Sequence, residues 1–309
     1  MKYILLTGGT GFIGSQLAEK LLEQKENIIL LKRSYSDTWR IDDYIDSFPN
    51  IELIDIDKNN IESIFGNYDI EGILHLATYY TKFHKSNDIA DMIESNITFP
   101  TDLLENAVKN NCKYFINTGS FGEYSMEKIP IDENVKISPF NLYSSTKVAF
   151  EDILKYYNTE YSIKASTLKL FTPYGPKDDE NKIIPYLIVN SIKGNKITIQ
   201  STSKKLDVVH VNDIIEAYIQ TKNNIKKFNN YENFNIANGT SHSIKEIYSI
   251  VEEKLGKAEV EFLESDLSEV KANIDKSKNM INWIPKVSLE EGLQLTIEYY
   301  KNKYGNWKR

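Results

Sequence analysis

Glycines at positions 8, 11 and 14 restrict the possible folds of this chain more than any other feature. They follow an apolar run at residues 3–6 and precede Ile13, Leu17 and Leu21, which recur at helical spacing. Strand, glycine turn and helix is the order of a dinucleotide-binding unit, in which the glycines admit a pyrophosphate beside the helix N-terminus. A Gly-rich turn can also simply connect a strand to a helix without binding a ligand. We nevertheless predict a cofactor site lined by Gly8, Thr10, Gly11, Phe12, Ile13 and Gly14.

The bulk properties of the sequence exclude several classes of partner. The 309 residues are 41% hydrophobic, enough for a sizeable core, and their net charge of −7 disfavours binding to nucleic acid polymers or anionic membranes. The N-terminal apolar run is too short for a signal peptide or a membrane span, so we expect a cytoplasmic protein. The single cysteine, Cys112, excludes an intrachain disulfide, and the four histidines lack metal-ligand spacing. We therefore predict no metal site.

Short β-type runs alternate with helical patterns through the first half of the chain. This alternation predicts an α/β fold with a Rossmann-type doubly wound parallel sheet. The expected strands cover residues 28–31, 51–54, 73–76, 114–118 and 165–170, and the expected helices 12–24, 59–66, 87–109 and 143–158, with Pro100 dividing the third. The alternation stops after residue 171. We expect a cofactor-binding domain over residues 1–170 and a smaller mixed α/β substrate lobe over residues 171–309, from which residues 203–222 return to the first domain.

The end of the second expected strand carries Lys32, Arg33 and Ser34. A fold that prefers NAD(H) places a carboxylate there for the ribose 2′-hydroxyl, whereas cationic and hydroxyl groups suit a 2′-phosphate. The alternative is that the Lys32 and Arg33 side chains are exposed to solvent and bind no phosphate. We predict NADP(H) in preference to NAD(H).

Tyr143 and Lys147 stand four residues apart on an expected helix, so their side chains are neighbours on one face. An ammonium beside a phenol is expected to lower the phenol pKa and let the hydroxyl exchange protons. Tyr299 and Lys303 repeat the spacing in the C-terminal segment, where we expect surface roles. Ser120 ends another expected strand, at the sheet edge where ligands bind. These residues predict a catalytic group of Tyr143, Lys147 and Ser120.

Together with further motifs, these residues resemble the extended short-chain dehydrogenase/reductase family of NAD(P)-dependent nucleotide-sugar epimerases, dehydratases and reductases. The further motifs are residues 75–78 (His-Leu-Ala-Thr), 168–176, 207–213 and 282–286. The resemblance implies that Tyr143 and Lys147 also contact the cofactor, together with Asp55, Ile56, Leu76, Ala77, Thr78 and Asn96. It implies substrate contacts from Thr78, Tyr79, Ser120, Phe121, Thr172 and Lys205. His75 is expected to be a structural histidine rather than a catalyst.

Departures from the family pattern narrow the expected reaction. In the 4,6-dehydratases an Asp-Glu pair follows the catalytic hydroxyl, but here Phe121 and Gly122 follow Ser120. Leu206 stands where the family has an arginine that contacts the substrate diphosphate, and we expect Lys204 or Lys205 to make that contact instead. Residues 31–41 and 205–207 resemble the branch of CDP-abequose and CDP-paratose synthases, which reduce 4-keto-deoxysugars.

The leading hypothesis is an NADPH-dependent reductase of the C4 ketone of a nucleotide-linked deoxysugar, CDP being the favoured nucleotide, in the synthesis of surface-polysaccharide sugars. The second hypothesis is a nucleotide-sugar 4-epimerase with tightly bound NAD(P), which would use the same residues. The third is a non-catalytic NADPH-binding regulator, disfavoured because Tyr143 and Lys147 are both present. The resemblance also implies a homodimer, joined through the helices at 87–109 and 143–158.

Overall fold

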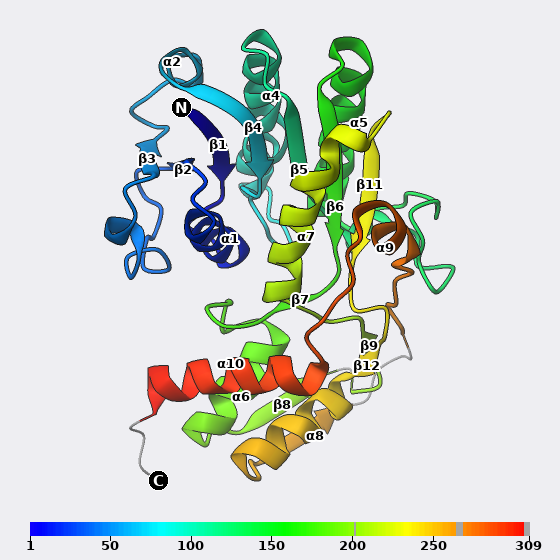
Figure 1. The fold of residues 1–309 in the computed structure, drawn as a ribbon. Helices are drawn as coiled ribbons and strands as arrows, with labels where there is room; N and C mark the ends of the chain where they lie inside the picture. Colours follow the sequence, from blue (N-terminus) through cyan, green and yellow to red (C-terminus); the bar gives the residue numbers. More distant parts are fainter. Residues whose placement is uncertain (201, 264–267, 306–309) are drawn as a thin grey trace. The chain divides into compact units, whose positions relative to one another are not determined.

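The computed structural model describes residues 1–200, 202–263 and 268–305. Its central feature is a seven-stranded sheet in the order β11-β6-β5-β4-β1-β2-β3 (Figure 1). β1 pairs in parallel with β2 and with β4, and β2–β3 and β4–β5 are also parallel. The predicted Rossmann-type sheet is confirmed. Its strands are β1 (Lys2–Thr7), β2 (Ile28–Lys32), β3 (Ile51–Asp55), β4 (Asp69–His75), β5 (Tyr114–Ser120), β6 (Lys164–Leu170) and β11 (Glu232–Ile236).

Helices cover both faces of this sheet. Leu5 of β1, Phe65 of α2, Leu103 of α4 and Phe150 of α5 share one core cluster, which places these three helices on one face. α1 and α7 lie on the other face (Figure 1). The helical elements of this half are α1 (Phe12–Glu23), η1 (Ile45–Ser47), α2 (Ile61–Asn67), α3 (Asp88–Ile93), η2 (Glu94–Thr98), α4 (Phe99–Lys109), η3 (Phe121–Glu123), α5 (Leu142–Tyr161), α7 (Val211–Asn224) and η4 (Ile225–Lys227).

The helix expected at residues 87–109 is divided, as Pro100 predicts. α3 passes into the π-helical segment η2, and α4 then begins with Pro100 in its first turn. Proline lacks the N–H that would bond to the carbonyl four residues back, and its ring clashes with that carbonyl. The wider π turn accommodates the proline, and it carries Ser95 and Asn96, both buried, beside the ends of the strands.

The chain forms two compact units. Unit 1 comprises Met1–Ser125, Asn134–Lys169 and Ala217–Phe234, and unit 2 comprises Met126–Glu133, Leu170–Glu216 and Asn235–Arg309. The single boundary at residue 170 stays a prediction. In unit 2, Leu187, Ile247 and Leu293 from three helices share a core. Its elements are β7 (Pro173–Tyr174), α6 (Ile183–Lys193), β8 (Ile197–Gln200), β9 (Lys205–Leu206), β10 (Val209–His210), β12 (His242–Ser243), α8 (Ile244–Leu255), β13 (Val260–Leu263), α9 (Asp275–Ile281) and α10 (Leu289–Tyr304). None of the helices in the described ranges is long and apolar enough to cross a membrane.

Two buried aspartates in unit 2 hold loops together through backbone amides. The Asp207 carboxylate accepts hydrogen bonds from the amides of Asn238 at 2.7 Å, Gly239 at 3.1 Å and Ala272 at 3.0 Å. The Asp213 carboxylate accepts from the amides of Lys286 and Val287. The motifs at 207–213 and 282–286 therefore stabilise the fold of this unit.

Asp207→Ala is expected to lower the free energy of unfolding by about 2 to 3 kcal/mol, because it leaves one buried and two partly buried amides without their acceptor. Urea denaturation followed by circular dichroism measures this change. Asp46→Ala, which removes an exposed carboxylate, is the control. Equal unfolding free energies for the two variants would contradict the structural role of Asp207.

Candidate active site

The glycine turn between β1 and α1 has the close approaches that a dinucleotide site requires. Gly8 has a φ of +71°, and a Cβ on it would lie 2.6 Å from the Ala77 amide nitrogen. A Cβ on Gly14 would lie 2.1 Å from the Gly8 carbonyl oxygen, so helix and turn touch backbone to backbone. α1 begins at Phe12, and its N-cap, Gly11, supplies no side-chain cap. The first-turn amides of α1 are thus available to a phosphate, and the turn fits a dinucleotide.

Thr7 joins β1 to the segment that follows β4. Its hydroxyl lies 2.8 Å from Nδ1 of His75 and accepts hydrogen bonds from the amides of Leu76 and Ala77. Burial, followed by the charge of Lys147, holds the His75 pKa well below its usual range. His75 is therefore a neutral, structural histidine, as expected. Leu76 and Ala77 lie beside the glycine turn, on the switch point between β1 and β4.

Asn96 fastens the segment after Ala77 to α5. Its Oδ1 accepts from the Thr78 hydroxyl at 3.0 Å and from the Tyr79 amide at 2.8 Å. Its Nδ2 donates to the Tyr79 carbonyl and to the Thr146 hydroxyl, both at 3.0 Å. These bonds make Asn96 an organiser of the site, and its predicted cofactor contact stays a prediction.

The residues predicted for the 2′-phosphate lie together at the ends of β2 and β3. The Arg33 guanidinium donates to the Ser95 hydroxyl at 2.9 Å and to the Tyr35 hydroxyl at 2.6 Å. The Ser34 hydroxyl donates to the Asp55 carboxylate at 2.7 Å, and the Lys32 ammonium lies 3.8 Å from the same carboxylate. Asp55 thus offsets part of the positive charge here. Ile56 follows, half-buried against the main core.

Tyr143 and Lys147 lie in the first two turns of α5, whose N-cap Asn141 accepts a hydrogen bond from the Ser144 amide at 2.8 Å. The Lys147 ammonium lies 5.8 Å from the centre of the Tyr143 ring. The Tyr143 ring also contacts the Tyr80 ring edge to face, with 4.9 Å between the ring centres. The predicted pairing of Tyr143 with Lys147 on one face of a helix is therefore present.

The expected net lowering of the Tyr143 pKa is wrong for the free protein. Burial raises the pKa of the Tyr143 phenol, the negative charge of Glu123 raises it further, and a hydrogen bond with Thr78 lowers it only in part. Burial also lowers the pKa of Lys147 to about 8. Helical spacing revealed the lysine but not that Lys147 is buried and Tyr143 half-buried. The phenol, which is protonated at neutral pH at its ordinary pKa, is a weaker acid in these surroundings.

Ser120 ends β5, beside the first turn of α5. The one-turn helix η3 follows, and a Cβ on Gly122 would lie 2.6 Å from the Ser144 hydroxyl. The Ser120 oxygen accepts from the Gly122 amide at 3.2 Å, which leaves the hydroxyl hydrogen to donate. Phe121 packs on Phe140. This geometry allows Ser120 to act as a hydrogen-bond donor to a ligand oxygen.

Sequence reasoning missed a buried ionic cluster below Ser120. Lys169 of β6 lies 2.8 Å from the Glu123 carboxylate and 3.0 Å from that of Glu151, on α5. Glu123 and Lys169 are both fully buried. Glu123 lies in the segment after Ser120 that departs from the family pattern, and this was the available signal in the sequence. Its partners, Glu151 and Lys169, lie far away along the chain.

Two predicted substrate residues belong to unit 2. Thr172 precedes β7, and its buried hydroxyl lacks a partner among the described residues. The Lys205 side chain is exposed, while its backbone pairs with Ser243 and bonds to Ser268. Leu206, at the position of the family arginine, is buried in the core. The substrate contacts of Thr172 and Lys205 stay predictions.

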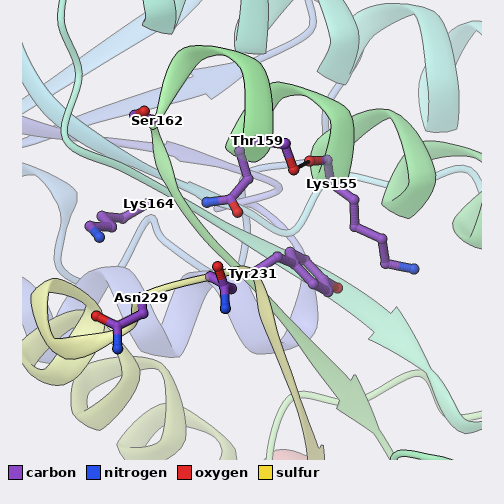
Figure 2. A pocket seen from close by; sticks show the side chains of 8 residues that line it. Lys155, Thr159, Ser162, Lys164, Asn229 and Tyr231 are labelled. Carbon is purple, nitrogen blue, oxygen red and sulfur yellow. Dashed lines mark hydrogen bonds between the residues drawn. The ribbon is translucent and has the colours of Figure 1, made fainter.

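A polar cavity of about 510 Å³ lies elsewhere in unit 1, at the C-terminal end of α5. Figure 2 shows Lys155, Lys164 and Tyr231 around it, and none of the predicted site residues lines it. It opens near the first residue of β6, whereas the predicted site lies at the last residues of the strands. Within the described ranges, no group of three or more His, Cys, Asp or Glu side chains is placed to hold a metal ion.

Comparisons with known proteins agree with this geometry. Residues 4–237 match the NAD dependent epimerase/dehydratase family. A UDP-glucuronate 4-epimerase of Thermodesulfobacterium geofontis is 30% identical over 318 residues, covering 97% of each chain. A CDP-abequose synthase of Salmonella typhimurium is 26% identical over 305 residues, covering 95% of this chain and 96% of that protein.

Solved structures have the same fold over nearly the whole chain. The UDP-glucuronic acid 4-epimerase of Bacillus cereus, in complex with UDP-glucuronic acid and NAD, has a TM-score of 0.88 and 25% identity, covering 98% of this chain and 100% of that one. The glycine turn, the Tyr143–Lys147 pair and a family match over more than half of the sequence lead to one conclusion: the chain belongs to the NAD-dependent epimerase/dehydratase family.

Proposed function

We propose that this protein is an NADPH-dependent reductase that converts the C4 ketone of a nucleotide-linked 4-keto-deoxysugar, with CDP as the favoured nucleotide, to an alcohol. The observation that carries the proposal is the Tyr143 phenol, whose ring centre lies 5.8 Å from the Lys147 ammonium on one face of α5. A protonated phenol is ready to act as an acid towards a developing alkoxide. The absence of an Asp-Glu pair after Ser120 argues against dehydration.

Each catalytic residue has a role that follows from its geometry. The reduced nicotinamide, when bound, supplies a hydride. Tyr143 donates its proton to the sugar oxygen, and Ser120 donates a hydrogen bond to the same oxygen as negative charge develops on it. Lys147 would hold the nicotinamide ribose, and its positive charge stabilises the phenolate that remains. The glycine turn would bind the pyrophosphate.

NADPH is expected to bind more tightly than NADH by about 1 to 3 kcal/mol, the range for hydrogen bonds to charged groups. The reason is the group of Lys32, Arg33 and Ser34 at the end of β2. Arg33→Asp should move the preference towards NADH. Calorimetric titration with each cofactor measures both effects, and Lys20→Asp on α1, which makes the same change of charge, is the control. Equal affinities of the unaltered protein for the two cofactors would contradict the 2′-phosphate site.

A 4-epimerase is the second candidate function. It is supported by the 30% identity to a UDP-glucuronate 4-epimerase and by the presence of the same Tyr-Lys pair. An epimerase must first remove a proton from the substrate hydroxyl, which requires Tyr143 as a base. The cationic and hydroxyl groups of Lys32, Arg33 and Ser34, which suit a consumed NADPH, favour the reductase.

One assay separates the two candidates. The protein is incubated with NADPH and a panel of CDP-, GDP-, dTDP- and UDP-linked 4-keto-6-deoxysugars, and loss of the reduced nicotinamide absorbance is followed. Stoichiometric oxidation of NADPH with one of these sugars is the expected result. Interconversion of UDP-glucuronate and its C4 epimer without net oxidation would favour the epimerase instead.

A further inference from the structure

The Glu123 carboxyl group has no role in the reaction as proposed, yet it lies directly behind Ser120. β5 ends at Ser120, and the single turn of η3 brings the side chain of Glu123 back to it. Glu123 Oε1 accepts a hydrogen bond from the Ser120 amide at 2.6 Å. The Gly122 amide in turn donates to the Ser120 hydroxyl oxygen. These reciprocal bonds form a capping box that fixes both the backbone and the side chain of Ser120.

The turn that carries Glu123 is closely packed on both sides. A Cβ on Gly119 would lie 2.8 Å from Oε1 of Glu123 and 2.7 Å from the Thr167 methyl group. On the other side Gly122 packs against Ser144 of α5. The carboxylate is therefore held between β6 and α5, in a position set by close packing.

Glu123 belongs to a cluster of two carboxylates and two ammonium groups. Lys169 is shared by the carboxylates of Glu123 and Glu151, and Lys155 lies 3.0 Å from the outer oxygen of Glu151. Burial raises the pKa of Glu123 to about 7, Lys169 opposes this rise, and the charge of Glu151 adds to it. Burial also opposes ionisation of Glu151, but Lys169 and Lys155 hold its pKa below the usual range. Glu123 is therefore the carboxyl in this cluster that exchanges a proton near neutrality.

The charge of Glu123 acts on both reacting side chains of α5. It raises the pKa of Tyr143 and opposes the lowering of the Lys147 pKa by burial. The titratable groups that interact with Glu123 come from two elements and one connecting segment. β6 supplies Lys169, and the segment ahead of β11 supplies Tyr231. α5 supplies Tyr143, Lys147 and Glu151. Tyr80 and Tyr218 interact with Tyr143, and His75 with Lys147.

We propose that Glu123 is a positioning residue for the reduction: its carboxylate fixes the backbone and the hydroxyl of Ser120 and acts through its charge on Tyr143 and Lys147. This inference rests on the proposed function, because it assigns Glu123 a role in the same site.

Glu123→Gln tests the charge while keeping an oxygen for the Ser120 amide. Reduction by the unaltered protein is expected to fall at high pH as Tyr143 and Lys147 lose their protons. In Glu123→Gln this fall should begin about one pH unit lower. Glu151→Gln is the matched control, because it removes a carboxylate from the same cluster that does not contact Ser120. Its high-pH fall should stay where the unaltered protein has it.

Two further variants separate position from charge. Glu123→Ala removes the acceptor of the Ser120 amide and is expected to lower kcat about tenfold at mildly acidic pH, where Lys147 keeps its charge and the cofactor affinity changes little. Glu123→Asp retains the charge and should keep the high-pH fall of the unaltered protein. The Asp variant therefore tests the proposal even if the Gln variant does not fold, as circular dichroism would show.

A binding measurement separates this inference from the proposed reaction. The affinities for NADPH and NADH are measured by titration across the alkaline range, where loss of the Lys147 charge weakens binding. A displacement of this curve in Glu123→Gln, but not in Glu151→Gln, supports the inference even if no 4-keto sugar is reduced. Coincident curves for the unaltered protein and Glu123→Gln, or equal displacements in both Gln variants, would overturn it.

Discussion

Tyr143→Phe is expected to lower the turnover of 4-keto sugar by about 10²- to 10⁴-fold, the usual contribution of a general acid. The change removes the proton donor and keeps the ring, so the edge-to-face contact with Tyr80 remains. The cofactor affinity should change little because the glycine turn is untouched. Single-turnover measurements with bound NADPH report the chemical step, and a separate titration reports the affinity.

Tyr299→Phe is the matched control. Tyr299 lies on α10, four residues before Lys303, so it repeats the spacing of Tyr143 and Lys147 on a helix of unit 2, where its ring packs against the core of that unit. The ammonium of Lys303 is bound to Glu180 at 2.8 Å. We expect the control to keep full turnover. A Tyr143→Phe protein with near-normal single-turnover rates would overturn the assignment and direct the search for the acid to Thr78, Tyr79 or Tyr80.

The parts of the site that sequence could predict are local. Gly8, Gly11 and Gly14 belong to one turn, and helical geometry alone makes Tyr143 and Lys147 neighbours. Six of the seven strands of the central sheet are predicted for a similar reason, since each contains a short apolar run. β11 is not predicted, because only Phe234 and Ile236 in it are apolar. β4 begins at Asp69, earlier than expected, because Asp69, Glu71 and Gly72 hide its pattern. Gly72 is required there by the Tyr114 ring, which occupies the place of its Cβ.

The cluster of Glu123, Lys169 and Glu151 shows why the rest could not be predicted. Each residue is an ordinary charged side chain in the sequence, and charged side chains are mostly exposed. Only the packing of β6 against η3 and α5 brings them together in the interior. The sign of the Tyr143 pKa shift depends on the same packing. The sequence predicts which groups react, whereas tertiary structure determines their proton affinities.

Lys147→Met is expected to lower turnover by about 10²- to 10³-fold and, unlike Tyr143→Phe, to weaken cofactor binding as well. The substitution preserves most of the buried volume and removes the charge. Two consequences follow from that loss: the phenolate formed at Tyr143 is no longer stabilised, and the ribose loses a donor. Single-turnover rates and NADPH titrations on the same preparation measure the two effects separately.

The pH dependence of binding gives a stricter test of Lys147. Because the pKa of this amine is lowered to about 8 in the free protein, its charge is present below that pH and is lost above it. Cofactor affinity of the unaltered protein should therefore fall as pH rises through about 8, and the fall should be absent in Lys147→Met. Lys303→Met, which removes an ammonium at the same helical spacing from a tyrosine, should retain the fall. If affinity in Lys147→Met declines with pH as in the unaltered protein, another group binds the cofactor ribose, and Lys147 acts on Tyr143 alone.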